Sequence, residues 1–292
     1  MSYFIVLTLT GVAAGMIYSA LALALVLIWR ATRVVNFAQG AMAMTTTYIA
    51  LAVIQATGNY WVGFFAALAA GLVIGGVAER TLVRSVESGP PLNAVIVTLG
   101  LFLVLESVVP MIWGAQIKAF PAPLSIAATQ VGSHFIALSP FSIFTIGIVL
   151  LVMVAVLVLF RFTGLGLSMR AAAFAPETAR LMGVRVGRLL TFGWALAGMT
   201  GAVAGLLVAP ILLLYPSNMD AVLVYGFTAA VLGGLDSPVG ALVGGLGIGL
   251  ALSYIGGYLG GDLESFGALV ILIVLLMVRP HGLFVHTVER RV

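Results

Sequence analysis

The chain has 292 residues, of which 62% are hydrophobic and only 8% are charged, and its mean hydropathy is +1.23. A water-soluble domain carries about a quarter charged residues, so this composition excludes a soluble globule and predicts a polytopic membrane protein. The formal net charge is +4. Its basic residues lie in short segments beside apolar runs, which favours membrane orientation over nucleic-acid binding. Cysteine is absent, which excludes disulfides and thiolate metal sites.

Nine apolar runs approach the roughly 20 residues that a spanning helix needs. The first run lacks a preceding basic region and continues to Ile28, which predicts a spanning helix and not a cleavable signal. If one run is re-entrant or merges with its neighbour, the count is eight. The sequence therefore predicts an all-α bundle of 8–9 transmembrane helices, some of them short or broken. The runs cover residues 4–28, 35–54, 61–78, 93–113, 139–160, 189–208, 219–235, 239–256 and 264–278.

The basic residues predict how the chain is threaded. With the N-terminus outside, nine crossings put twelve of the thirteen Lys and Arg residues on the inner side and leave Lys118 outside, as the positive-inside rule requires. The longest outer segment, 114–138, contains Pro121 and Pro123, and we expect a short surface helix within it. The inner segments are 29–33, 79–92, 161–188, 236–238 and 279–292.

Glycines predict where the helices approach one another. Two small residues spaced four apart let neighbouring helix backbones come close in a membrane. Glycines lining a solute path are the alternative interpretation of the same spacing. The pairs are Gly71 with Gly75, Gly201 with Gly205, Gly240 with Gly244, and Gly245 with Gly249.

An amide-rich cluster opens the second run: Asn36-Phe37-Ala38-Gln39-Gly40. Two amides and a glycine at a helix start fit either helix capping or a polar path where a helix is interrupted inside the membrane. Thr45, Thr46 and Thr47 follow, and their hydroxyls can line the same path or bond back to their own helix.

Two further features depart from plain lipid-facing helix. Glu106 lies inside the fourth run, where a carboxylate is costly, so it indicates a hydrogen bond to a neighbouring helix or a proton relay. Gly233-Gly234 with Asp236-Ser237-Pro238 is a turn signal that joins two short runs as a hairpin and could bracket a solute path.

The inner segment 161–188 carries five of the thirteen basic residues. Pro176 near a helix start, Glu177 in its first turn and Gly183 at its end predict a short helix. Such an element fits docking into a groove of a partner, or lying on anionic lipid headgroups.

The chain lacks the motifs of the common enzymes. It has no P-loop, no G-x-S-x-G and no H-E-x-x-H motif. His134, His281 and His286 are scattered, so no metal site is predicted. The sequence therefore predicts a transport subunit that has no catalytic site and binds no cofactor of its own.

Five stretches, in this order, resemble the inner-membrane permeases of branched-chain amino acid ABC importers, of the LivH type. The resemblance covers almost the whole chain, although permeases for urea and sugars share much of the pattern. It implies one permease domain over residues 1–292, with 161–188 as its cytoplasmic coupling loop. The stretches are 36–40, Glu79 to Arg84, Gly166 to Gly183, Phe227 to Gly240, and Arg279 to Phe284.

The resemblance also implies a multi-pass protein of the bacterial inner membrane with several partners. These are a second permease subunit, homologous or identical, two cytoplasmic ATPase subunits that bind ATP and Mg²⁺, and a periplasmic or lipid-anchored solute-binding protein. The coupling helix would be formed or positioned by Arg170, Ala171, Glu177, Ala179 and Gly183. This chain has Phe174-Ala175 where the family often has Asn or Asp, which weakens any capping bond at the start of that helix and the match to the family's docking detail.

The expected function is ATP-driven import of a small solute by alternating access, with branched-chain amino acids as the leading substrates. Candidate path or gate residues are Asn36, Phe37, Gln39, Gly40, Thr45, Gly233 and Gly234. The rival functions are a secondary carrier or channel, a urea or amide permease of the same family, and a membrane scaffold.

Overall fold

The computed structural model describes residues 3–86, 89–131, 134–136, 138–279 and 282–284. Helices dominate this part of the chain, and the predicted all-α bundle is confirmed. The elements in chain order are α1 (Tyr3–Thr32), α2 (Gln39–Thr57), α3 (Tyr60–Ala78), the π-helix η1 (Glu79–Val83), α4 (Pro91–Trp113), β1 (Thr129–Val131), β2 (His134–Ile136), α5 (Pro140–Phe162), α6 (Gly164–Phe174), α7 (Pro176–Leu181), α8 (Val186–Leu212), α9 (Asp220–Gly233), α10 (Pro238–Leu259) and α11 (Leu263–Val278).

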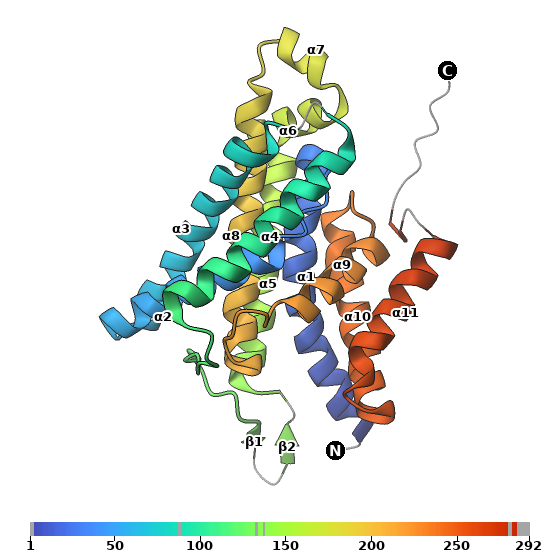
Figure 1. The fold of residues 1–292 in the computed structure, drawn as a ribbon. Helices are drawn as coiled ribbons and strands as arrows, with labels where there is room; N and C mark the ends of the chain where they lie inside the picture. Colours follow the sequence, from blue (N-terminus) through green and yellow to red (C-terminus); the bar gives the residue numbers. More distant parts are fainter. Residues whose placement is uncertain (1–2, 87–88, 132–133, 137, 280–281, 285–292) are drawn as a thin grey trace.

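Each of the nine predicted apolar runs forms a helix. Seven helices in the described part of the chain are long and apolar enough to cross a membrane, whereas α9 and α11 are shorter apolar helices. Helix α1 begins at the end of the bundle opposite α7, and α11 runs from that same end in the direction of α7 without reaching it (Figure 1). The end that carries α7 also carries the arginines of α1 and α6, so we call it the inner end, as the basic residues predict.

Two helices begin inside the bundle instead of at its ends. Helix α1 stops at Arg33, whose φ of 57° is left-handed, and non-helical backbone leads to α2. Gln39 at the start of α2 donates its side-chain amide to the carbonyl of Ala197, near the middle of α8 (3.0 Å). The carbonyl of Met219, just before α9, lies against Gly40. The first turns of α2 and α9 therefore meet within the bundle, and the prediction of broken helices is confirmed.

The predicted glycine crossings are real contacts. Helix α3 crosses α8 where Gly71 faces the backbone of Gly198 and Gly75 faces that of Trp194, so a β-carbon at either glycine would strike backbone atoms. Helix α10 crosses α1 in the same way, with Gly249 against Gly15. These two crossings bring four helices close together through dispersion contacts, which drive helix association in lipid.

The outer segment differs from the prediction. The expected surface helix in 114–138 is absent from its described residues, and β1 and β2 pair there as an antiparallel ribbon with Thr129 opposite Ile136. The sequence alternates β-branched and polar residues over Thr129-Gln130-Val131, and such patterns favour strand over helix. Lys118 pairs with Leu214 through two backbone hydrogen bonds of 2.9 Å, which fasten this segment to the outer end of the bundle.

Candidate functional site

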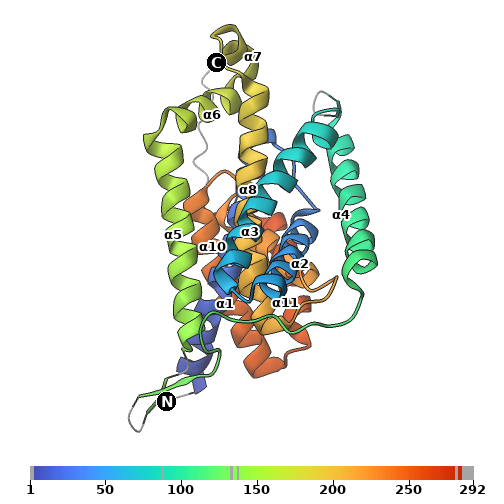
Figure 2. The same cartoon turned by 90° about the vertical axis from the view of Figure 1, so that its left-hand side faces the viewer.

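The inner loop consists of two helices, α6 and α7, held between α5 and α8 (Figure 2). Helix α7 ends as predicted. Gly183 adopts a φ of +82°, its N–H donates to the Arg180 carbonyl (3.0 Å), and the N–H of Val184 donates to the Ala179 carbonyl (3.0 Å). This pair of bonds is the Schellman motif, which satisfies carbonyls at a helix end and requires a residue that tolerates positive φ. The loop therefore has a defined backbone shape.

Sequence reasoning missed α6. Thr163 caps this helix by accepting the Gly166 N–H (3.1 Å), and the helix buries one face through Gly166, Met169 and Ala172. A threonine before a run of small and apolar residues was the available signal. Ala175 then separates α6 from α7 and gives α7 no side-chain cap, as the Phe174-Ala175 sequence predicts.

The tip of the loop presents apolar side chains to its surroundings. Phe174, Leu181 and Met182 are 85%, 88% and 80% exposed. Ala179 is buried and packs with Ala172, Val186 and Leu190 under the tip. Exposed apolar residues on a folded loop indicate a surface that another molecule covers. The remaining predicted coupling residues, Arg170, Ala171, Glu177 and Gly183, are all exposed around it.

A charged contact joins the π-helix η1 to the start of α8, and the sequence shows its two residues, Glu79 and Arg84, only as the ends of one of the five matching stretches. Glu79, which is 1% exposed, accepts from Nε and Nη2 of Arg84 at 2.7–3.0 Å and from the Thr191 hydroxyl at 2.6 Å. Arg84 also donates to the Gly187 carbonyl at 2.7 Å. The π-helix at the end of α3 is thereby joined to the first turns of α8, directly after the loop.

The amide side chains of the cluster are buried in this structure. Asn36 and Gln39 are both 0% exposed, and the Asn36 amide donates to Gln39 Oε1 (3.0 Å). Asn36 Oδ1 accepts the N–H of Ala38 (3.0 Å), so the amides brace the start of α2. Phe37 lies 6.4 Å from the ring of Phe227 on α9. The cluster joins α2, α8 and α9, and its role as a path or gate stays a prediction.

The other predicted path residues are also packed. Thr45 is buried and bonds back to the Ala41 carbonyl (2.7 Å). Gly233 and Gly234 form the α9–α10 hairpin, where Gly233 touches the Gly240 backbone. Leu283 donates its N–H to the Leu232 carbonyl (2.9 Å), so this residue of the fifth matching stretch lies against the end of α9.

Glu106 has an acidic neighbour that the sequence did not reveal. Asp220, the first residue of α9, lies beside it, although the two positions are far apart along the chain. One carboxyl oxygen of Glu106 is buried without a hydrogen-bond partner in the described structure. The two carboxyls lie on α4 and at the start of α9, and the choice between a hydrogen bond to a neighbouring helix and a proton relay stays a prediction.

A cavity of about 530 Å³ opens near the outer end, between α1, α5, α8 and α9. Its walls are mostly apolar, including Ile17, Phe141 and Val208, and its polar groups include Tyr18, Tyr225 and Glu264. None of the predicted path residues lines it. Ligand pockets have this character, an apolar wall with a few polar groups that fix orientation.

The described residues offer no cluster of three His, Asp or Glu side chains that could hold a metal ion. His281 and His286 lie outside the described residues.

Comparisons with known proteins agree with this architecture. The family model described as "Branched-chain amino acid transport system / permease component" matches residues 7–278. The chain is 29% identical to the high-affinity branched-chain amino acid transport system permease protein LivH of Salmonella typhimurium, covering 96% of this chain and 95% of the relative. It is also 29% identical to a probable branched-chain amino acid transport permease protein LivH of Methanocaldococcus jannaschii, over 90% and 87% of the two chains.

Among solved structures, PsaBC from Streptococcus pneumoniae in complex with Fab overlaps 96% of this chain and 93% of its own at 14% identity, with a TM-score of 0.48. The family match spans nearly all the described helices, from α1 to the end of α11. The chain therefore belongs to the family of branched-chain amino acid transport permeases and is a multi-pass membrane permease.

Proposed function

We propose that this chain is the permease subunit of an ATP-driven importer in the bacterial inner membrane. It pairs with a second permease subunit, receives solute from a periplasmic or lipid-anchored binding protein, and is driven by two cytoplasmic ATPase subunits. It moves small apolar amino acids by alternating access, and the α6–α7 loop is its contact with the ATPases.

The observation that carries this proposal is the exposed tip of the loop. Phe174, Leu181 and Met182 are each at least 80% exposed, although the backbone beneath them is fixed by the bonds around Gly183. A rigid apolar projection fits a groove on a partner. The Glu79–Arg84 contact gives movements of that projection a direct connection to α3 and α8.

The outer cavity supports the proposal that the solute is a small apolar amino acid. Its apolar walls suit a branched aliphatic side chain, and Glu264 offers a carboxylate to a solute ammonium group. The closed amide cluster below it suits the inner gate of a conformation that is open only to the outside. Opening it would require α2 and α9 to separate at Gly40.

The decisive experiment is reconstitution of the chain with its ATPase subunits, second permease and binding protein in liposomes. Leucine should accumulate only when ATP and the binding protein are supplied. Uptake that continues without the ATPase subunits would show a secondary carrier or channel, and the absence of any accumulation would favour a scaffold.

Substrate choice needs a separate assay in the same liposomes. Leucine, isoleucine and valine should compete with one another, and urea should not. Replacement of Glu264 by Gln should raise the leucine concentration for half-maximal uptake about tenfold, because loss of a charge-assisted contact of roughly 1.4 kcal/mol corresponds to that factor. Competition by urea alone would assign the chain to amide import.

A further inference from the structure

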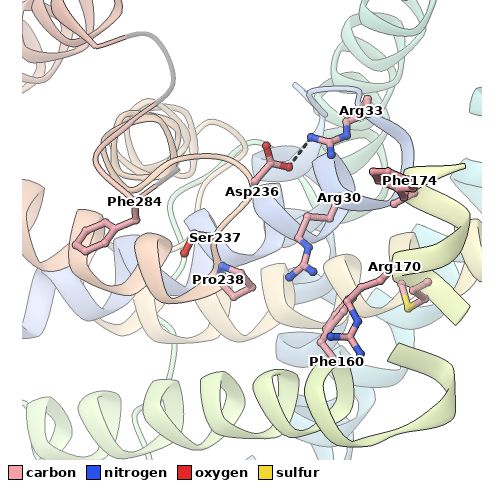
Figure 3. Close-up of a pocket in the computed structure, with 11 residues that line it drawn as sticks. Arg30, Arg33, Phe160, Arg170, Phe174, Asp236, Ser237, Pro238 and Phe284 are labelled. Atoms are coloured by element: carbon pink, nitrogen blue, oxygen red, sulfur yellow. Dashed lines mark hydrogen bonds and ion pairs between the residues drawn. The ribbon is translucent and has the colours of Figure 1, made fainter. Parts of the chain in front are cut away.

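A second cavity, of about 610 Å³, lies at the inner end under α6 (Figure 3). Three arginines enter it from two different elements: Arg30 and Arg33 from the end of α1, and Arg170 from α6. Asp236 is the one acidic side chain among its described lining residues, and it forms an ion pair with Arg33. The cavity therefore carries two more positive charges than negative ones.

Neither Arg30 nor Arg170 forms an ion pair with the described residues. Arg30 is partly buried, and its guanidinium stands 4.7 Å from the centre of the Phe160 ring. Figure 3 shows the Arg30 and Arg170 side chains directed toward the same space beside Phe160. Like charges at close range repel, so an anion placed between these two arginines would relieve an unfavourable interaction.

The position of the cavity relative to the ends of the spanning helices indicates what that anion is. Arg30, Phe160 and Pro238 each lie within two residues of an end of α1, α5 or α10, three helices that are long enough to span the membrane. The ends of spanning helices mark the headgroup region of a bilayer. Phe162 and Leu167, which lie two residues along the chain from the lining residues Phe160 and Met169, are 76% and 62% exposed, which suits contact with acyl chains.

From these observations we infer that the inner cavity binds the phosphate of an anionic phospholipid headgroup between Arg30 and Arg170. Basic pockets between transmembrane helices on the cytoplasmic side have the charge and the position for such headgroups. A bound phosphate would join α6 of the inner loop to α1 of the bundle, a second connection alongside Glu79–Arg84. Its binding depends on neither ATP nor partner subunits, so it can be tested apart from transport.

The test measures binding of phosphatidylglycerol and phosphatidylcholine to the purified full-length chain by native mass spectrometry. Arg30→Gln with Arg170→Gln should weaken phosphatidylglycerol binding roughly thirtyfold, at about fivefold for each basic residue near a headgroup. The control is Arg180→Gln with Arg188→Gln, which removes the same charge at the same end but outside the cavity. It should change binding less than twofold. Equal losses in both pairs, or no loss in the first, would overturn the inference.

A variant that is expected to bind phosphatidylglycerol more strongly separates loss of the site from misfolding. Asp236→Asn removes the acidic lining residue and should strengthen phosphatidylglycerol binding about fivefold, whereas unchanged or weaker binding counts against the site. Inorganic phosphate in millimolar excess distinguishes the source of the anion. If it displaces the lipid and stabilises the chain in phosphatidylcholine as well as phosphatidylglycerol does, the occupant is soluble phosphate and the headgroup assignment is wrong.

Discussion

The glycine crossings in the middle of the bundle and the loop at its inner end are stabilised in opposite ways. At the crossing of α3 with α8, backbone touches backbone and no room exists for a single added carbon. In the α6–α7 loop, a few hydrogen bonds fix the chain while its largest side chains stay exposed. The crossings are therefore expected to decide whether the bundle assembles, and the proposed function makes the loop the surface that a partner engages.

The comparison also shows where the two regions meet. Glu79 and Arg84 join the end of α3 to the first turns of α8, between the glycine crossing and the loop. If the loop moves as proposed, the crossing next to it should transmit the movement without being compressed, because packed interiors are rigid. Substitutions at the crossing, at the loop and at this junction should have separable effects.

The largest effect is expected at the crossing. Gly198→Leu places a side chain against the carbonyl of Gly71, and such overpacking against backbone should cost about 3 kcal/mol or more. The chain should fail to form a monodisperse, protease-resistant bundle, as measured by size-exclusion chromatography and limited proteolysis. Gly147→Leu is the control, because no atom lies within 4 Å of a β-carbon there. A well-assembled Gly198→Leu chain would contradict the packing role of the glycines.

The next effect is expected at the end of α7. Gly183→Pro removes the N–H that donates to Arg180 and forbids the φ of +82°. The bundle should still assemble, but solute-stimulated ATP hydrolysis by the reconstituted complex should be lost. The Gly183→Ala variant should keep most of the stimulated ATP hydrolysis. Alanine retains the N–H, and its left-handed backbone conformation costs only roughly 1 kcal/mol. Normal stimulation in the proline variant would disprove the coupling role of the loop.

A smaller loss of stability is expected at the junction. Glu79→Gln keeps the shape of the side chain but removes the charge that Arg84 contacts. The free energy of unfolding should fall by about 1.5–3 kcal/mol, a range that allows for the partial exposure of Arg84. Thermal unfolding in detergent measures this loss, with Arg80→Gln as an exposed control in the same segment. Equal melting temperatures for the two variants would show that the Glu79–Arg84 contact does not stabilise the fold.

The smallest effect on stability is expected at the tip. Leu181→Ser with Met182→Ser changes two side chains that are 88% and 80% exposed, so the unfolding free energy should shift by no more than about 0.5 kcal/mol. Affinity for the ATPase subunits should nevertheless fall about tenfold or more, because exposed apolar anchors contribute most where a partner buries them. Co-purification yields measure this affinity, and undiminished co-purification would place the docking surface elsewhere.

The sequence alone determined the parts of the fold that depend on local pattern. Apolar runs predicted nine of the helices, and seven of these, in the described part of the chain, have the length and composition that a membrane crossing requires. Glycine spacing located the helix crossings, and Pro176 with Gly183 marked both ends of α7. The family was also recognisable from short stretches in a fixed order.

Only the tertiary structure decided which distant residues meet. Asp220 beside Glu106, Asp236 with Arg33, and Arg170 beside Arg30 at the inner cavity are pairs whose members lie far apart in the chain. The outer ribbon and the closed state of the amide cluster likewise depend on neighbours that no local pattern specifies. Helix formation in a membrane follows from each segment's own hydrogen bonds and hydrophobicity, whereas polar side chains find their partners only after the helices have packed.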